Sequence, residues 1–338
     1  MNRASKLKEI WQKIENEGTE GLVKRAFDIP SCLKTFCTYS YPDRYFGIAF
    51  SFHQDINLDI SVFKDLSELN ISLFKDNSFP DAKLLLIQLT NREPRVNDIF
   101  ATICANIIDS ILNAESEREG VRLVIAQLRK WKDLFSKRRI QRLSAQEQQG
   151  LYGELFFLRK LLLSIDKTKA LITWVGPEKA PKDFQSDMWA VEVKSSSATN
   201  NSGILINGEF QLDESNIEQL FLYNLIVEVS QRKGESLPDI IAAIREFLAD
   251  NQKASVIFEE KLLLAGYYAH DEEFYQEYNY CILKEQYFDV SDDFPRIKKN
   301  ELRLGVFDVK YCISLEPIVE KKVNENNVIN TIETYEGN

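Results

Sequence analysis

The stretch Trp189-Ala-Val-Glu-Val-Lys-Ser-Ser196 has the alternation of a β-strand. Successive side chains of a strand point to opposite faces, so Glu192 and Lys194 share one face and Val191 and Val193 share the other. Asp183, in Pro-Lys-Asp-Phe, precedes Glu192 by nine residues. If the two segments pair as neighbouring strands, an Asp, a Glu and a Lys converge.

Such a trio suits the hydrolysis of a phosphodiester. Two carboxylates hold a hard cation, which polarises a phosphoryl oxygen and lowers the pKa of a bound water, and an ammonium offsets the charge that develops in the transition state. Oxygen ligands of this kind favour Mg²⁺ or Mn²⁺ over zinc.

The pattern Asp183, eight residues, Glu192-Val-Lys194 resembles the signature of the PD-(D/E)XK nucleases, the superfamily of restriction endonucleases and many repair nucleases. Gly-Glu154-Leu-Phe-Phe-Leu upstream and Gln211-Leu downstream make the chain similar to an uncharacterised bacterial family within it. The resemblance implies a restriction-endonuclease-like fold and a metal site formed by Asp183, Glu192 and Glu154, with Lys194 as a catalytic residue. Lys182 interrupts the Pro-Asp pair of the signature, so Asp187 is an alternative ligand.

Glu154 can be weighed without the resemblance. Leu151, Leu155, Leu158 and Leu162 recur at helical spacing, and Glu154 lies at the edge of this stripe. The ordinary interpretation is an edge carboxylate paired with Arg159 or with a backbone group. Beside Asp183 and Glu192, a place in a metal site is the better interpretation.

Glu192 and Lys194 also have an ordinary interpretation, as an exposed ion pair on a solvated strand. A small polar run follows them from Ser195 and Ser196 to Gly203, which predicts a loop where the strand ends. Loops at strand ends often carry function, so Ser195 and Ser196 are candidate nucleic-acid contacts. The resemblance gives Gln211 the same role, although a surface glutamine explains it nearly as well.

Length and composition place the chain among folded globular proteins. It has 338 residues, of which 44% are hydrophobic, which is room for two domains. The first twenty residues are charged and lack an apolar signal region, and no apolar run approaches a membrane span, so a cytoplasmic protein is expected. The five cysteines lack metal-ligand spacing, and only His53 and His270 accompany them.

The net charge of −10 argues against coating of nucleic acid by bulk electrostatics. Residues 122–142, however, contain eight Lys or Arg residues and one Asp, a local surplus of seven. Within this basic segment, phosphate contacts are expected from Lys137, Arg138, Arg139 and Arg142. The alternative is a solvated helix face.

The periodicities predict an α/β (α+β) protein. An N-terminal α+β domain (1–92) has a helix at 4–17 and strands at 45–52, 69–74 and 83–89. Connecting helices at 96–112 and 116–135 lie within 93–143. The nuclease-like domain (144–318) has a central mixed sheet flanked by helices at 146–165, 238–248 and 253–265. Its strands are expected at 171–175, around Asp183 and Glu192, and at 204–207, 220–229, 275–290 and 302–315. The segment 319–338 is expected to be a polar tail that frays.

These residues predict a Mg²⁺- or Mn²⁺-dependent DNA endonuclease. The resemblance adds bacterial defence against foreign DNA, with other defence proteins or a homodimer as partners, since cutting both strands commonly needs two sites. The alternative is a nucleic-acid-binding or scaffolding subunit whose nuclease-like core is silent or switched on by a partner. The sequence does not discriminate DNA from RNA or define a recognition site.

Overall fold

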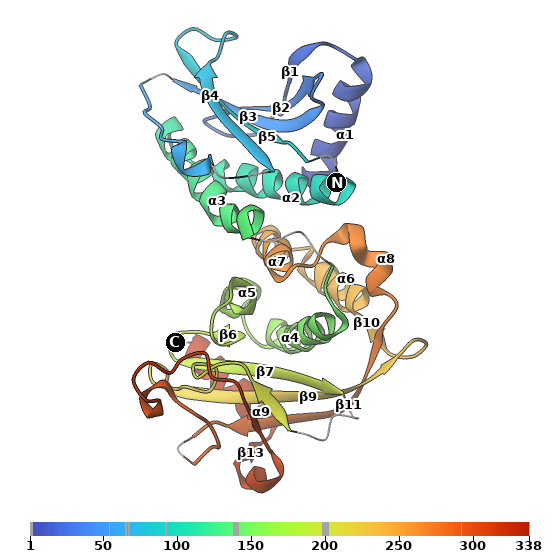
Figure 1. Cartoon of the computed structure of the whole chain (residues 1–338), viewed down its shortest axis with the longest axis vertical. Helices are drawn as coiled ribbons and strands as arrows, with labels where there is room; N and C mark the ends of the chain where they lie inside the picture. The colour runs from blue at the N-terminus through green and yellow to red at the C-terminus, as the bar shows by residue number, and fades with distance from the viewer. Residues whose placement is uncertain are drawn as a thin grey trace. The chain divides into compact units, whose positions relative to one another are not determined.

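The computed structural model describes residues 3–53, 55–64, 66, 68–91, 93–137, 142–197, 203–291 and 293–337. The chain forms two compact units, coloured along the chain in Figure 1. The first unit contains residues 1–141 and 268–270, and the second contains residues 142–267 and 271–338. Both combine helices with sheets, which confirms the mixed α/β class. No helix among the described residues is long and apolar enough to span a membrane.

The first unit contains an antiparallel sheet with the strand order β1-β2-β3-β5-β4. These strands are β1 (Gly21–Ala26), β2 (Lys34–Tyr41), β3 (Tyr45–His53), β4 (Leu69–Lys75) and β5 (Ala82–Leu89). The helices are α1 (Arg3–Glu17), α2 (Pro94–Ile111) and α3 (Glu117–Lys137). Trp11 of α1 stacks on Phe100 of α2 and donates its indole N–H to the carbonyl of Gly47, 2.8 Å away, which fixes α1 to the sheet. The predicted elements are confirmed, and β1 and β2 are additional.

The second unit is organised by a sheet with the order β10-β11-β9-β7-β6, in which β13 also pairs with β11. Its strands are β6 (Phe184–Gln185), β7 (Trp189–Ser197), β9 (Gln219–Ser230), β10 (Glu235–Ser236), β11 (Asn279–Asp289) and β13 (Lys322–Val323). The β7–β9 pair is parallel, and the other pairs are antiparallel. The sheet is therefore mixed, as predicted.

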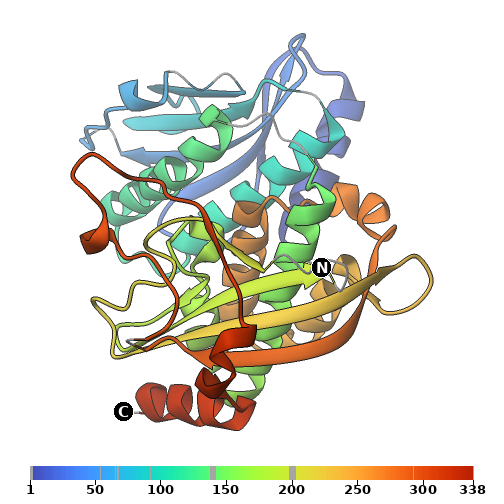
Figure 2. The ribbon, with the colours of Figure 1, turned by 60° about the horizontal axis from the view of Figure 1, so that its bottom comes forward.

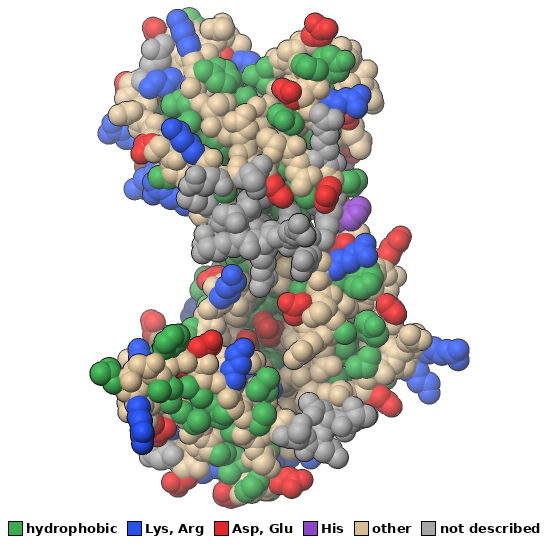
Figure 3. All heavy atoms as spheres, in the orientation of Figure 1, with side chains coloured by type: hydrophobic (Ala, Val, Ile, Leu, Met, Phe, Trp, Pro, Cys, Tyr) green, Lys and Arg blue, Asp and Glu red, His purple; other side chains and the backbone are tan. Residues whose placement is uncertain are grey.

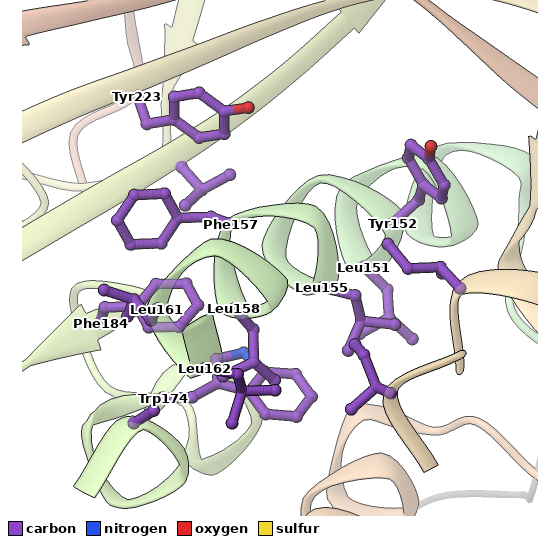
Figure 4. Packing of buried hydrophobic residues seen from close by; sticks show 14 of the residues in the cluster. Leu151, Tyr152, Leu155, Phe157, Leu158, Leu161, Leu162, Trp174, Phe184 and Tyr223 are labelled. Atoms are coloured by element: carbon purple, nitrogen blue, oxygen red, sulfur yellow. The ribbon is translucent and has the colours of Figure 1, made fainter. Parts of the chain in front are cut away.

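Helices cover one face of this sheet (Figure 1). They include α4 (Ala145–Ser164), α5 (Lys167–Thr173), α6 (Leu237–Leu248), α7 (Gln252–Ala265) and the short α8 (Glu272–Tyr275). Figure 4 shows the core beside α4, where Phe157 meets Phe184 and Tyr223 of the sheet. A Cβ on Gly153 would lie 2.9 Å from Cβ of Ser195, so this glycine allows α4 to approach β7 closely.

A second apolar cluster covers the opposite face of the sheet. It includes Ala190 of β7 and Leu222 of β9, together with Ile206 and Ile313. The last two belong to β8 (Ile204–Ile206) and β12 (Tyr311–Ile313), which form a separate two-stranded sheet. Because both faces are covered, β7 is buried from Trp189 to Val193. The predicted strand at 204–207 thus exists, but it lies outside the central sheet.

Three sequence predictions are wrong. Residues 171–175 lie mostly in α5, because Asp166 caps a helix by accepting hydrogen bonds from the amides of Thr168 and Lys169, and only Trp174 makes an isolated bridge to Phe184. Of the strand predicted at 302–315, only β12 forms. The tail expected to fray instead contains α9 (Glu325–Gly337), in which two side chains are fully buried. Figure 2 shows this C-terminal helix in red.

Candidate active site

The edge of β7 is only partly paired. Parallel β9 lies on one side, whereas β6 on the other side pairs only Phe184 with Val191 and Gln185 with Ala190. Beyond these pairs, the Val193 amide donates to Oδ2 of Asp183, 2.8 Å away. A carboxylate thus takes the place of a strand partner, and it lies directly beside the strand that carries Glu192 and Lys194.

The loop after α5 fixes the backbone of Asp183. The Asp183 carbonyl accepts hydrogen bonds from the amides of Val175 and Gly176, at 2.8 and 2.9 Å. A Cβ on Gly176 would lie 2.8 Å from Oε2 of Glu154 and 3.0 Å from Oδ1 of Asp183. Glycine therefore leaves the space in which these two carboxylates come together.

Glu154 reaches this site from α4. Its Oε2 atom accepts a hydrogen bond of 2.7 Å from the indole N–H of Trp174. Arg159, the partner considered from the sequence, instead forms an ion pair with Glu235, with 2.6 Å between N and O. The carboxylate of Glu154 is thus directed towards Asp183 and not along the helix surface.

Lys194 completes the group of charges. Its ammonium lies 2.8 Å from Oε1 of Glu192 and 2.9 Å from Oε1 of Gln211, which also accepts the Asn207 amide at 2.7 Å. The Glu192 side chain is only 1% exposed and that of Lys194 15%. The pair is therefore buried, unlike a solvated surface pair, and Gln211 holds the ammonium in place.

Burial sets the protonation of the carboxylates. It raises the pKa of Glu192 to about 8, with a further rise from the charge of Asp183, against the lowering by Lys194. It raises the pKa of Asp183 to about 6, against the lowering by Lys194 and by the Val193 hydrogen bond. Burial and the charge of Asp183 also raise the pKa of Glu154 well above its usual value. For Lys194, burial disfavours the charged form, but the carboxylates raise its pKa.

The oxygen donors of the site match the preferences of a hard divalent cation. Among the described residues, no three His, Cys, Asp or Glu side chains form a preformed metal cluster. Oε2 of Glu192 is nevertheless buried without a hydrogen-bond partner in the described part of the chain. A buried carboxylate oxygen without a partner is costly. Oxygen donors from Glu154, Asp183 and Glu192 suit Mg²⁺ or Mn²⁺, and a cation would relieve their desolvation and mutual repulsion.

Three residues that support the site were not found by sequence reasoning. Trp174 and Gly176 contact the carboxylates directly, as described above. Lys261 of α7, which is 4% exposed, donates to the carbonyls of Ile172 and Trp174 and pairs with Glu178, 3.2 Å away. It thereby fixes the loop that holds Asp183. A lysine next to the apolar run Leu262-Leu-Leu was the available signal.

The remaining candidates lie in several environments. Asp187 is exposed in the turn between β6 and β7. Ser195 packs against Gly153, and its hydroxyl is buried without a partner among the described residues, whereas Ser196 is half-buried. The structure therefore brings Asp183, rather than Asp187, together with Glu154, Glu192 and Lys194.

The basic segment is described only in part. Arg138, Arg139 and the side chain of Lys137 lie outside the described residues. Arg142 forms an ion pair with Asp271, 3.0 Å between N and O, and its guanidinium lies over the ring of Phe274. This residue therefore also has a structural role within the second unit. On the face shown in Figure 3, Lys and Arg side chains are interspersed with Asp and Glu.

A comparison with protein families finds one match. The family described as "Putative PD-(D/E)XK family member (DUF4420)" matches residues 7–316. No curated protein and no solved structure gives a significant match. The match extends over both units and over every residue of the site, so the chain belongs to this PD-(D/E)XK family.

Proposed function

We propose that this member of the PD-(D/E)XK family is a metal-dependent phosphodiester hydrolase that cuts DNA. One observation carries the proposal: Glu154, Asp183, Glu192 and Lys194 come from a helix, a loop and a strand, and they form one electrostatically coupled group in which Glu192 is buried and the others are half-buried. Structural ion pairs rarely bring three carboxylates around one lysine, because burial of such charge is costly.

Each residue has a proposed role. Asp183 and Glu192 would hold Mg²⁺ or Mn²⁺, and Glu154 would complete the set of ligands. The cation, when bound, supplies a polarised phosphoryl oxygen and a water of lowered pKa. Asp183 is held in place by Val193 and by the loop amides, and Glu154 by Trp174. The side chains of Asp183 and Glu154 are therefore held in position by neighbouring donors.

Lys194 would act on the substrate. Its ammonium would stabilise the negative charge that develops on the phosphate, or orient the attacking water. Its ammonium pairs with Glu192, whose second oxygen has no hydrogen-bond partner among the described residues. A cation on Glu192 would compete with this ion pair and leave the ammonium for the phosphate, while Gln211 keeps it in position.

The cellular role follows from the same proposal. Defence of a bacterial cell against foreign DNA, in the cytoplasm and as a homodimer with two active sites, is consistent with a PD-(D/E)XK endonuclease. A second function is a partner-activated or silent nucleic-acid-binding subunit. The net charge of −10 favours this alternative, because it opposes binding of a nucleic acid by this chain alone.

The test is cleavage of supercoiled plasmid, linear DNA and RNA in Mg²⁺, in Mn²⁺ and in chelator. Lys194→Ala and Asp183→Asn should each lower the rate by at least about a hundredfold, because they remove groups that act on the transition state. Asp187→Asn is the matched control and should cut normally.

The possible outcomes separate the two functions. Loss of activity in Asp187→Asn with a normal Asp183→Asn would contradict the ligand assignment. If metal raises the thermal stability of the wild-type protein but no substrate is cut, a partner or a modified substrate is missing. If metal does not raise its thermal stability, the protein is a silent nucleic-acid-binding subunit.

A further inference from the structure

The loop between Arg303 and Asp308 exposes an apolar tip. Leu304 is fully exposed (106%), and Phe307 and Val306 are 78% and 49% exposed. This run of apolar residues predicts a strand, but it pairs with no strand among the described residues. Figure 2 shows the segment, in red-orange, as a long loop leaving the sheet. Three large apolar side chains exposed together indicate a contact with another molecule.

The loop is attached to the segment that holds the catalytic lysine in place. The Val309 amide donates to Oε2 of Glu209, 3.2 Å away, and Nζ of Lys299 lies 5.1 Å from the centre of the Phe210 ring. The next residue, Gln211, accepts the hydrogen bond from Lys194. The apolar tip is therefore connected through one short segment to the candidate active site.

A groove lies between β6 and the base of the loop. Its volume is about 640 Å³, and its lining residues include Lys182, Gln185, Phe210, Asp213 and Lys299. Gln185 lies two residues after Asp183 in the chain. The groove therefore extends from the neighbourhood of Asp183 in the chain to Lys299 at the base of the loop.

The charge of the loop fits a polyanion. Residues 296–310 contain five Lys or Arg and two Asp or Glu residues, a net charge of +3 in a chain whose net charge is −10. Arg296 and Lys298 pair with Glu214, whereas the exposed Arg303 and Lys310 have no ion-pair partner in the described part of the chain. Cations that flank an apolar tip match the phosphates and base steps of a nucleic acid.

We propose that residues 303–310 form a DNA-binding wedge. Leu304 and Phe307 enter a groove of the duplex and press against a base step, while Arg303 and Lys310 contact the flanking phosphates. This inference rests on the proposed function, because it assigns the binding mode of the substrate at the same site. The basic flanks favour DNA over a neutral apolar partner.

The experiment measures binding without cleavage, in chelator, to a duplex that carries the fluorescent base 2-aminopurine. Wild-type protein should raise the fluorescence by unstacking the base. The double variant Leu304→Ala/Phe307→Ala should abolish that rise and weaken binding by about tenfold or more. Leu163→Ala, which removes a 72% exposed leucine from α4, is the matched control and should behave as wild type.

A second pair of substitutions tests the flanks. Arg303→Gln/Lys310→Gln should reduce the slope of log affinity against log salt by about two, because two phosphate contacts are lost. Both residues are exposed, so the folded protein should tolerate the change.

Three results would overturn the wedge. The first is wild-type affinity and fluorescence in the apolar double variant. The second is sedimentation showing that this variant dissociates a dimer, which would make the tip an interface between copies. The third is that this variant no longer binds anionic vesicles but still binds DNA with the wild-type affinity. Plasmid cleavage is measured separately. A fluorescence change that depends on Leu304 and Phe307, without any plasmid cleavage, would support the wedge and contradict only the proposed nuclease activity.

Discussion

Glu192 is the residue whose environment departs furthest from what its local sequence suggests. A glutamate on a strand normally faces water, but here its side chain is buried with one oxygen on Lys194 and one without a partner among the described residues. Because the neutral form avoids the cost of burying a charge, the folded protein retains a proton that the unfolded chain releases.

This retained proton predicts an unusual pH dependence. Between the ordinary pKa of 4.5 and the folded value of about 8, folded Glu192 binds more protons than the unfolded chain. The free energy of unfolding of the metal-free protein should therefore fall as the pH rises through this window, by up to about 1.4 kcal/mol per pH unit from this group. The decrease should be complete above the folded pKa.

The Glu192→Gln variant has no titrating group at this position, so its free energy of unfolding should depend less on pH. Urea unfolding in chelator from pH 5 to pH 9 would show similar stabilities at the acidic end and a more stable variant at the alkaline end. Asp187→Asn, which changes an exposed carboxylate, should keep the wild-type slope. Parallel curves for wild type and Glu192→Gln would contradict the prediction.

At the scale of elements, the loop from Trp174 to Glu178 decides the geometry of the site. Gly176→Ala would place a Cβ within 3 Å of the Glu154 and Asp183 carboxylates. Both neighbouring atoms are at the ends of side chains, so the fold should survive while the ligands separate. Metal affinity, measured by calorimetry, should fall by about tenfold to a hundredfold, as for other changes beside ligands.

Gly150→Ala is the matched control for this substitution. A Cβ at Gly150 meets nothing within 4 Å, and the residue lies within α4. Alanine should therefore raise stability by up to about 1 kcal/mol and leave metal binding unchanged. Equal metal affinities for the two variants would show that Gly176 does not determine the spacing of the carboxylates.

Lys261 supports the same loop from α7. Lys261→Met removes the donor to the carbonyls of Ile172 and Trp174 and leaves Glu178 without its ion pair. Unsatisfied buried carbonyls should lower the free energy of unfolding by about 1–3 kcal/mol. Cleavage should fall as well, with kcat reduced more than KM changes. Lys253→Met, on the exposed face of α7, should change neither stability nor rate; a similar loss in both variants would contradict the loop-fixing role.

Local sequence patterns predicted those parts of the site that lie on single helices and strands. Helical spacing gave α4, alternation gave β7, and the spacing from Asp183 to Lys194 indicated the group that the structure brings together. Trp174 and Gly176 could not be found this way, because their contacts to Glu154 join residues about twenty positions apart that meet only after α5 turns back. The β-branched residues of 171–175 favoured a strand, and the Asp166 cap outweighed them.

At the scale of the whole molecule, the second unit is closed by its last helix. Val328 and Ile332 of α9 are fully buried, and the indole N–H of Trp189 donates to Glu336, 3.1 Å away. The polar composition of this segment obscured the helix, because only Val328 and Ile332 are fully buried, with Ile329 and Tyr335 packed beside them. This contact fixes the start of β7, the strand that carries Glu192 and Lys194.

Ile332→Ala should therefore destabilise the protein by about 2–5 kcal/mol, the cost of a cavity in a packed core. Thermal and urea unfolding would measure the loss. Asn326→Ala changes an exposed residue of the same helix and should have an effect below about 0.5 kcal/mol. An equally small effect of Ile332→Ala would mean that α9 is dispensable for the second unit.

The parallel pairing of β7 and β9 has a consequence for how such proteins diversify. Parallel neighbours cannot be joined by a tight turn, so the chain must leave the sheet after Ser197 and return at Gln219. That obligatory excursion carries Gln211, yet most of it lies outside the core beside α4. Ile204, Ile206 and Leu212 of the excursion are buried in the second apolar cluster, so substitutions cost little stability only at its exposed positions, such as Ser215 and Asn216. Under the proposed function, new target preferences can be acquired at such positions while Glu154, Asp183, Glu192 and Lys194 stay unchanged.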